Sequence, residues 1–210
     1  MTELVFILDR SGSMYGLEQD TIGGFNSMLE QQKQQPGEVL VSTVLFDHES
    51  VVLHDRVPLH KVPRMTEKEY TVRGCTALLD AVGSAIHHIG NVHKYARPED
   101  RPERTLFIIT TDGQENASRQ YSYERVRHMV QRQEKRFGWE FLFLGANIDA
   151  AAEGQRMGIQ PECTADYTCD AAGTAVNYAS ISAAICDVRC GRSLSPDWKR
   201  DIEKDHKTRG

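Results

Sequence analysis

The segment LVFILDRSGS, residues 4–13, decides the fold that this sequence predicts. Its first half, residues 4–8, is a continuous apolar run that is too short for an amphipathic helix. Such a run fits a strand buried on both faces of a parallel sheet. The run ends at Asp9, and Gly12 permits a tight turn directly after it. Polar residues at the end of a buried strand are typical of a ligand site in an open α/β sheet.

Two further apolar runs have the same character as the first one. They cover residues 106–109 and 141–144, and each ends at a turn rich in Gly, Asp or Asn. Between the runs, apolar residues recur at helical spacing over residues 22–29, 78–89 and 126–130. This alternation predicts a doubly wound, mostly parallel α/β sheet with helices on both faces.

One pair of expected strands breaks the alternation. Residues 39–46 and 51–57 are separated only by Asp-His-Glu-Ser at residues 47–50. That connection is too short to hold a crossover helix, so the two strands must form an antiparallel hairpin. The second strand carries an arginine and is followed by a proline, which suits the edge of a sheet.

These patterns also predict the order of the strands. The strands that end at Asp9, Asp112 and Gly145 should lie side by side, because successive βαβ units place their strands next to one another. The strand over residues 39–46 should lie on the other flank of the first strand. The strand over residues 51–57 should form the edge of the sheet.

Length and composition fit a single α/β domain followed by a tail. The chain has 210 residues, with 40% hydrophobic and 26% charged residues, which is ordinary globular usage. A last helix is expected over residues 173–190. After Arg192 charges crowd together and apolar residues thin out. We therefore expect a domain over residues 1–191 and a charged, frayed tail over residues 192–210.

Charge, hydropathy and cysteine count argue against several classes of partner. With 25 Lys and Arg against 30 Asp and Glu, the net charge of −5 provides no basic field for nucleic acid. No apolar run approaches the roughly 18 residues that span a bilayer, so we expect no membrane segment and a soluble, cytoplasmic protein. The cysteines number five, which is odd, and we expect them to be reduced thiols.

Hydroxyl and carboxylate side chains gather at one predicted edge of the sheet. The first strand runs into Asp9, Ser11 and Ser13, and the strand before Asp112 ends at the same edge. Thr76 lies at a further turn that leads into a helix. A ligand set made of oxygens alone suits a hard cation such as Mg²⁺, Mn²⁺ or Ca²⁺, and it disfavours zinc.

These residues resemble the metal-ion-dependent adhesion site of the von Willebrand factor A (vWA) domain family. Asp9-x-Ser11-x-Ser13, Thr76 within GCTALLDA and Asp112 within Thr-Asp-Gly match the family's positions in chain order. The resemblance spans residues 3–190 and implies a Rossmann-like, six-stranded sheet with one antiparallel edge strand. It also implies that Ser11, Ser13 and Thr76 contact the cation, with Asp9 and Asp112 acting directly or through water.

A cation held in this way implies a protein-binding function. If the carboxylates stand back behind water, the cation keeps much of its charge and one open position. An Asp or Glu side chain of a partner protein would fill that position. The resemblance thus implies a divalent-cation-dependent adhesion or scaffold module, with Mg²⁺ as the expected ion. It does not imply an enzyme, because the set contains no nucleophile paired with a base.

Other interpretations of the same residues stay open. The turn from Asp9 to Ser13 could simply cap a helix, because Asp and Ser are favoured at helix starts. A metal-dependent hydrolase or phosphatase would want a second acid where this chain has Ser11, or a base beside the metal. The chain could also be a structural member of the family whose site no longer selects a ligand.

Several neighbouring residues have two readings each. Asp80 could steady the site or be a surface acid, and Glu115 and Asn116 could line the rim or cap the next turn. The turn over residues 12–16 lacks the lysine of a phosphate loop, which leaves nucleotide binding unsupported. A zinc site with four thiolate ligands is an alternative interpretation of Cys163, Cys169, Cys186 and Cys190. The spacing of these cysteines departs from the usual Cys-x₂-Cys pattern. The identity of the partner and the oligomeric state are not set by the sequence.

Overall fold

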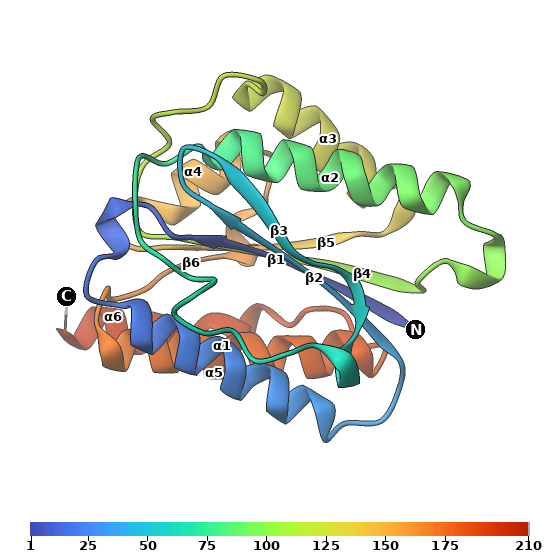
Figure 1. Cartoon of the computed structure of the whole chain (residues 1–210), viewed down its shortest axis with the longest axis horizontal. Helices are drawn as coiled ribbons and strands as arrows, with labels where there is room; N and C mark the ends of the chain where they lie inside the picture. Colours follow the sequence, from blue (N-terminus) through green and yellow to red (C-terminus); the bar gives the residue numbers. More distant parts are fainter. Residues whose placement is uncertain (210) are drawn as a thin grey trace.

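Six strands form one sheet in the order β3-β2-β1-β4-β5-β6 (Figure 1). The computed structural model describes residues 1–209 of the chain. The strands are β1 (Thr2–Asp9), β2 (Val39–Phe46), β3 (Ser50–Pro58), β4 (Arg104–Thr111), β5 (Glu140–Gly145) and β6 (Thr164–Asp166). Only β2 and β3 pair antiparallel, and all other neighbours are parallel. The predicted order of the first five strands and the predicted edge strand are confirmed.

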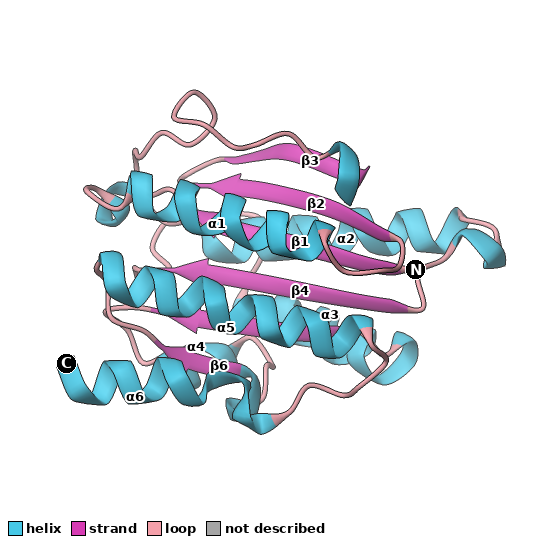
Figure 2. Ribbon diagram, turned by 90° about the horizontal axis from the view of Figure 1, so that it is seen from below, coloured by secondary structure: helices cyan, strands magenta, loops and turns pink. Residues whose placement is uncertain are grey.

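Helices cover both faces of the sheet, as the alternating pattern predicted (Figures 1 and 2). One face carries α1 (Glu18–Lys33), α5 (Ala171–Arg189) and α6 (Arg200–Arg209). The other face carries α2 (Leu78–Tyr95), α3 (Tyr123–Phe137) and α4 (Ala150–Arg156). The connections contain short 3₁₀ turns at η1 (Gly12–Met14), η2 (Leu59–Lys61), η3 (Pro98–Asp100), η4 (Pro161–Cys163) and η5 (Pro196–Lys199).

The central strands are continuously apolar because each of their faces packs into a core. Along β1, Phe6 and Leu8 enter the core shared with α1 and α5, and Val5 and Ile7 enter the core shared with α2 and α3. Phe6 meets Phe25 of α1 edge to face, with ring centroids 5.2 Å apart. Burial on both sides holds β1 rigidly, so the residue at its end has a fixed position.

The prediction of a frayed tail is wrong. The charged segment forms η5 and α6, and its two large apolar side chains, Trp198 and Ile202, are buried in the core under α5. The indole N–H of Trp198 donates to the Glu162 carbonyl at 2.9 Å, and Arg209 pairs with Asp170. Two apolar residues four positions apart form one helical stripe, which is enough to hold a helix whose other sides face solvent.

None of the helices in residues 1–209 is both long enough and apolar enough to cross a membrane.

Candidate metal site

The turn after β1 is held tightly against the neighbouring loops. The Arg10 N–H donates to the Phe46 carbonyl at 2.8 Å, and the Gly12 N–H donates to the Gly74 carbonyl at 3.0 Å. A Cβ atom at Gly12 would lie 3.3 Å from that Gly74 carbonyl oxygen, so glycine allows the close approach. The Ser11 N–H closes the turn by donating to Asp9 Oδ1 at 2.7 Å.

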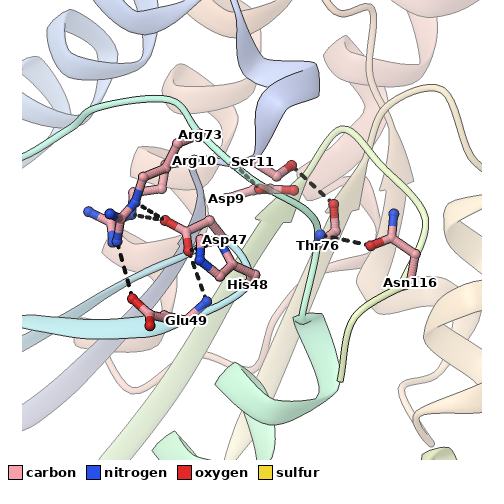
Figure 3. Close-up of polar contacts among 9 residues, drawn as sticks. All are labelled: Asp9, Arg10, Ser11, Asp47, His48, Glu49, Arg73, Thr76 and Asn116. Carbon is pink, nitrogen blue, oxygen red and sulfur yellow. Dashed lines mark hydrogen bonds and ion pairs between the residues drawn. The ribbon is translucent and has the colours of Figure 1, made fainter. Parts of the chain in front are cut away.

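The structure brings all five predicted site residues together in one hydrogen-bonded chain. The Thr76 hydroxyl donates to Ser11 Oγ at 3.1 Å, as Figure 3 shows, and Ser11 Oγ lies 3.1 Å from Ser13 Oγ. The Ser13 hydroxyl in turn donates to a carboxylate oxygen of Asp112. The fifth residue, Asp9, lies at the end of β1 and is bonded to Ser11 through its backbone N–H.

The two carboxylates of the site are buried without a compensating charge. Asp9 is 1% exposed and Asp112 is 2% exposed, and within residues 1–209 neither forms an ion pair. Burial raises the pKa of Asp9 to about 6, although a hydrogen bond from Thr111 opposes the shift. Burial also raises the pKa of Asp112. Buried negative charge of this kind is costly unless a cation or donors offset it.

This donor set fits a hard divalent cation. The converging atoms are hydroxyl and carboxylate oxygens, which are the ligands that Mg²⁺ and Ca²⁺ prefer. Of the five residues only Ser13 is exposed, so the cluster is open toward solvent on the Ser13 side and closed elsewhere. A cation bound there would supply the positive charge that Asp9 and Asp112 lack.

Three further residues hold Asp9 and Thr76 in place through hydrogen bonds. The sequence did not predict this role for them. The Thr111 hydroxyl donates to Asp9 Oδ2 at 2.5 Å, and the Tyr70 hydroxyl donates to the Asp9 carbonyl at 2.5 Å. Asn116 Oδ1 accepts from the Thr76 N–H at 2.9 Å, and the Asn116 N–H returns to the Thr76 carbonyl at 3.0 Å. Asn116 is exposed beside Thr76, so it lies at the rim of the site, where its side chain fixes the Thr76 backbone.

Glu115 and Asp80 hold the loop that follows Asp112. Glu115 accepts from the Leu79 N–H at the start of α2 and from backbone N–H groups of its own turn, so it acts as a cap. Asp80 accepts backbone N–H bonds from Arg119, Gln120 and Tyr121. Asp80 therefore steadies the loop over residues 113–121 without contacting the predicted ligands.

A cluster of charged residues around Asp47 lies beside the site and was not predicted from the sequence. The carboxylate of Asp47 lies 2.9 Å from Nε of Arg10 and 2.9 Å from Nε of Arg73 (Figure 3). Burial raises the pKa of Asp47, but donors from Glu49 and Arg73 outweigh it and leave this pKa below its usual value. The ligand atoms of Asp47, His48 and Glu49 are close enough to share a metal, but two guanidinium groups already neutralise Asp47.

The cysteines do not assemble a zinc site. Among residues 1–209, the cluster at Asp47 is the one group of three or more Cys, His, Asp or Glu side chains with metal-binding spacing. The five thiols form no disulfide in this part of the chain. Cys186 contacts Gln32 on α1, and Cys169 Sγ lies 3.6 Å from Asp112 Oδ2. Burial raises the pKa of Cys169 to about 11, so it remains a neutral thiol donor at the edge of the site.

The sheet, its two helical layers and the oxygen-rich edge at Asp9 define a class of protein, the doubly wound α/β domain with a candidate cation site. Solved structures give the particular fold. The chain has the fold of the vWA domain, and it is similar over 87% of its length to a von Willebrand factor type A structure from Catenulispora acidiphila, with a TM-score of 0.58 and 16% identity.

Other solved structures extend the likeness to pilus and matrix proteins. The vWF domain of the type V pili tip protein Mfa5 from Porphyromonas gingivalis has a TM-score of 0.62 and 11% identity, and the match covers 90% of this chain and 96% of that one. Proximal thread matrix protein 1 from the mussel byssus, solved with a zinc occupied MIDAS motif, has a TM-score of 0.59 and 15% identity.

These likenesses are limited in identity and in length. The match with the mussel matrix protein covers 88% of this chain but 46% of that one, so the chain spans about half of its length. The chain spans 42% of the Catenulispora structure. Such low identities show the fold alone. No protein-family model and no curated protein matches the sequence.

Proposed function

We propose that this chain is a divalent-cation-dependent module that docks an acidic residue of a partner protein. One observation carries the proposal: the buried carboxylates of Asp9 and Asp112 converge with three hydroxyls and have no basic partner in residues 1–209. The proposed ligands are Asp9, Ser11, Ser13, Thr76 and Asp112, and Mg²⁺ is the expected ion, with Mn²⁺ or Ca²⁺ as substitutes.

Some residues would hold the ligands of the ion in place, and others would leave the ion accessible to a partner. Thr111 and Tyr70 fix Asp9 through its carboxylate and its carbonyl, and Asn116 fixes Thr76. These bonds keep the oxygens in place before a cation arrives, which lowers the entropy that binding must lose. Ser13 is the exposed member, so a partner would approach from its side. The bound cation would supply an electrophilic centre for an anionic oxygen.

The same residues support binding rather than hydrolysis. A hydrolytic site needs a base beside the metal or an activated nucleophile. Here the thiol beside Asp112, Cys169, is held neutral by burial, and His48 lies against Asp47 in the arginine cluster. The similar structures are described as pilus and matrix proteins, which agrees with a binding role.

Calorimetric titration with Mg²⁺ tests the cation half of the proposal. The wild-type protein should bind one Mg²⁺, and Thr76→Ala should lose that binding. Ser84→Ala removes a hydroxyl from the exposed side of α2, so it should bind like wild type. If Thr76→Ala keeps full affinity, the cation lies elsewhere and the assignment of ligands is wrong.

A capture experiment tests the partner half. Immobilised protein is exposed to a lysate in Mg²⁺ or in chelator, and the captured proteins are compared by mass spectrometry. The proposal expects a partner that is retained in Mg²⁺, lost in chelator and lost with Thr76→Ala. That partner should also lose binding when one of its own Asp or Glu residues becomes an amide. A partner held equally in chelator would show that it uses another face.

A further inference from the structure

Helices α2 and α3 enclose a groove far from the candidate metal site. The groove has a volume of about 570 Å³, and a second hollow along α3 adjoins it at Met129 and Arg132. Thr76 lies just before the start of α2, whereas the groove is lined by Lys94 and Trp139, near the end of α2 and the start of β5. The two sites are therefore at opposite ends of α2, which lies beside α3 in Figure 1.

Basic side chains line this groove from both sides. Helix α3 presents Arg125, His128, Arg132 and Arg136, whose spacing of three or four residues places them along one side of the helix. From the other side, α2 contributes Lys94, and Arg101 follows in the next loop. We call the surface that these residues line the basic groove. One carboxylate, that of Glu124 at the beginning of α3, also lines it.

The charged side chains of the basic groove have no carboxylate partner within residues 1–209. The nearby acids Glu99 and Asp100 pair with Arg97 instead. Arg101 donates to backbone carbonyls at the end of α2, including that of Ala96 at 3.1 Å. Within residues 1–209 no carboxylate forms an ion pair with Lys94, Arg101, Arg132 or Arg136.

This concentration of charge does not follow from the needs of the fold. The chain as a whole carries a net charge of −5, yet four cations without a carboxylate partner line one groove. Arg132 and Arg136 are exposed, and their side chains form no hydrogen bond inside residues 1–209. Like charges placed close together repel one another, so an anionic ligand would relieve the repulsion.

Apolar side chains also line the groove, so we expect its ligand to carry an apolar side chain as well as negative charge. Ile86, Met129 and Trp139 line the groove, and the Trp139 ring stacks on Phe107 with centroids 5.2 Å apart. Phe137 stands at the rim and is 57% exposed. A large exposed aromatic beside other apolar side chains is a feature of protein-docking sites.

We propose that the basic groove docks an acidic segment of a protein partner that carries an aromatic or long aliphatic side chain among its Asp and Glu residues. The arginines and Lys94 match the carboxylates, and the floor around Met129 matches the apolar side chain. The inference does not depend on the proposed cation site, because none of its residues belongs to that site.

A nucleic acid fits the groove less well than an acidic peptide. A strand longer than the groove would extend over the surface of a chain with an excess of acidic residues, where phosphates are repelled. Unpaired bases also need several exposed aromatic faces to stack on, and of Trp139 and Phe137 in this groove only Phe137 is exposed. A peptide can be short enough to contact the groove alone.

Fluorescence anisotropy tests this proposal with a labelled peptide in which Glu residues alternate with Leu and Phe. The control peptide has each Glu replaced by Gln, and a single-stranded RNA oligonucleotide serves as the alternative polyanion. The test variant is Arg132→Gln with Arg136→Gln. The control variant is Lys68→Gln with Lys135→Gln, which removes the same charge from exposed positions outside the groove. None of these exposed side chains supports the core.

The acidic peptide should bind wild type, and the groove variant should lose about tenfold or more in affinity while the control variant stays within about twofold. Phe137→Ala should also weaken binding, because it removes the apolar rim. Three results would overturn the proposal: no binding of the acidic peptide, equal binding of the Gln peptide, or equal loss in both double variants. Tighter binding of the RNA at the same residues would assign the groove to nucleic acid instead.

Discussion

Asp9 contributes to the pH dependence of the unfolding free energy when no cation is bound. Its pKa is raised to about 6 in the folded chain, against 3.8 for the ordinary carboxyl group. The folded state therefore binds this proton more tightly than the unfolded state. The stabilising contribution is complete below the unfolded pKa and is lost as the pH rises through the folded pKa.

We expect Asp9→Asn to remove this loss. In chelator, wild type should lose up to about 3 kcal/mol more unfolding free energy than Asp9→Asn between about pH 4 and pH 7. Urea denaturation at a series of pH values measures the difference. Asp201→Asn, at an exposed position on α6, is the matched control and should follow wild type. Parallel pH curves for wild type and Asp9→Asn would contradict the assignment.

Gly12 offers a second test at a single residue. Gly12→Ala places a methyl group against the Gly74 carbonyl oxygen, which must move or push the turn outward. The turn carries Ser11 and Ser13, so Mg²⁺ affinity should fall and the unfolding free energy should drop by about 1 kcal/mol. Gly23→Ala in α1 has open space around its new methyl group and should instead stabilise by up to about 1 kcal/mol.

The two glycine variants separate the effect of the close contact at Gly12 from the effect of helix propensity at Gly23. Calorimetric titration with Mg²⁺ and urea denaturation are applied to both. If Gly12→Ala is as stable as wild type and binds Mg²⁺ equally well, the close contact between the two turns does not hold the site.

The site residues differ in how readily the sequence reveals them. Asp9, Ser11 and Ser13 lie within one turn, and Asp112 follows a buried strand, so linear spacing and strand ends were enough to find them. Thr111 and Tyr70 reach Asp9 from positions 102 and 61 residues away in the chain. Such long-range hydrogen bonds leave no local pattern, because any buried polar residue could find a partner of this kind.

At the scale of elements, length decided which parts of the fold could be predicted. Strands β1, β2, β4 and β5 and helices α1, α2, α3 and α5 have clear periodic or continuous apolar patterns. β6 has three residues and α4 has seven, and neither is long enough to show a period. A local hydrogen bond starts α4, because Asp149 accepts from the Ala152 N–H. A longer-range bond then ties α4 to β6, because Asp166 accepts from the Ala150 N–H at 2.8 Å.

Helix α6 gives a prediction at this scale. Ile202 is 1% exposed and is the one fully buried side chain of the helix in residues 200–209. Ile202→Ala should lower the unfolding free energy by about 2–5 kcal/mol, because it removes core contacts and leaves a cavity. Urea denaturation measures the loss. Thr208→Ala is an exposed control on the same helix and should change little, and equal stability of both variants would mean that α6 is not anchored by its apolar stripe.

At the scale of the whole molecule, the candidate metal site lies before the start of α2, and the basic groove extends toward the end of this helix. Leu78, Val82, Ile86 and Ile89 along this helix are all buried in one core. A helix packed along its length in this way has no hinge between its ends. The loop that carries Thr76 is also fixed independently, through Asn116 and the Asp47 carbonyl. This packing provides no movable element in residues 1–209 that would link the two sites.

We accordingly expect the two sites to bind independently. Saturating Mg²⁺ should leave the affinity for the acidic peptide unchanged, and Thr76→Ala should do the same. The variant with Arg132→Gln and Arg136→Gln should bind Mg²⁺ like wild type. Since coupling between two binding sites is reciprocal, the titrations of Mg²⁺ with and without peptide must agree with those of peptide with and without Mg²⁺. A several-fold change in both directions would show that α2 moves as a unit between two positions, which its continuous burial argues against.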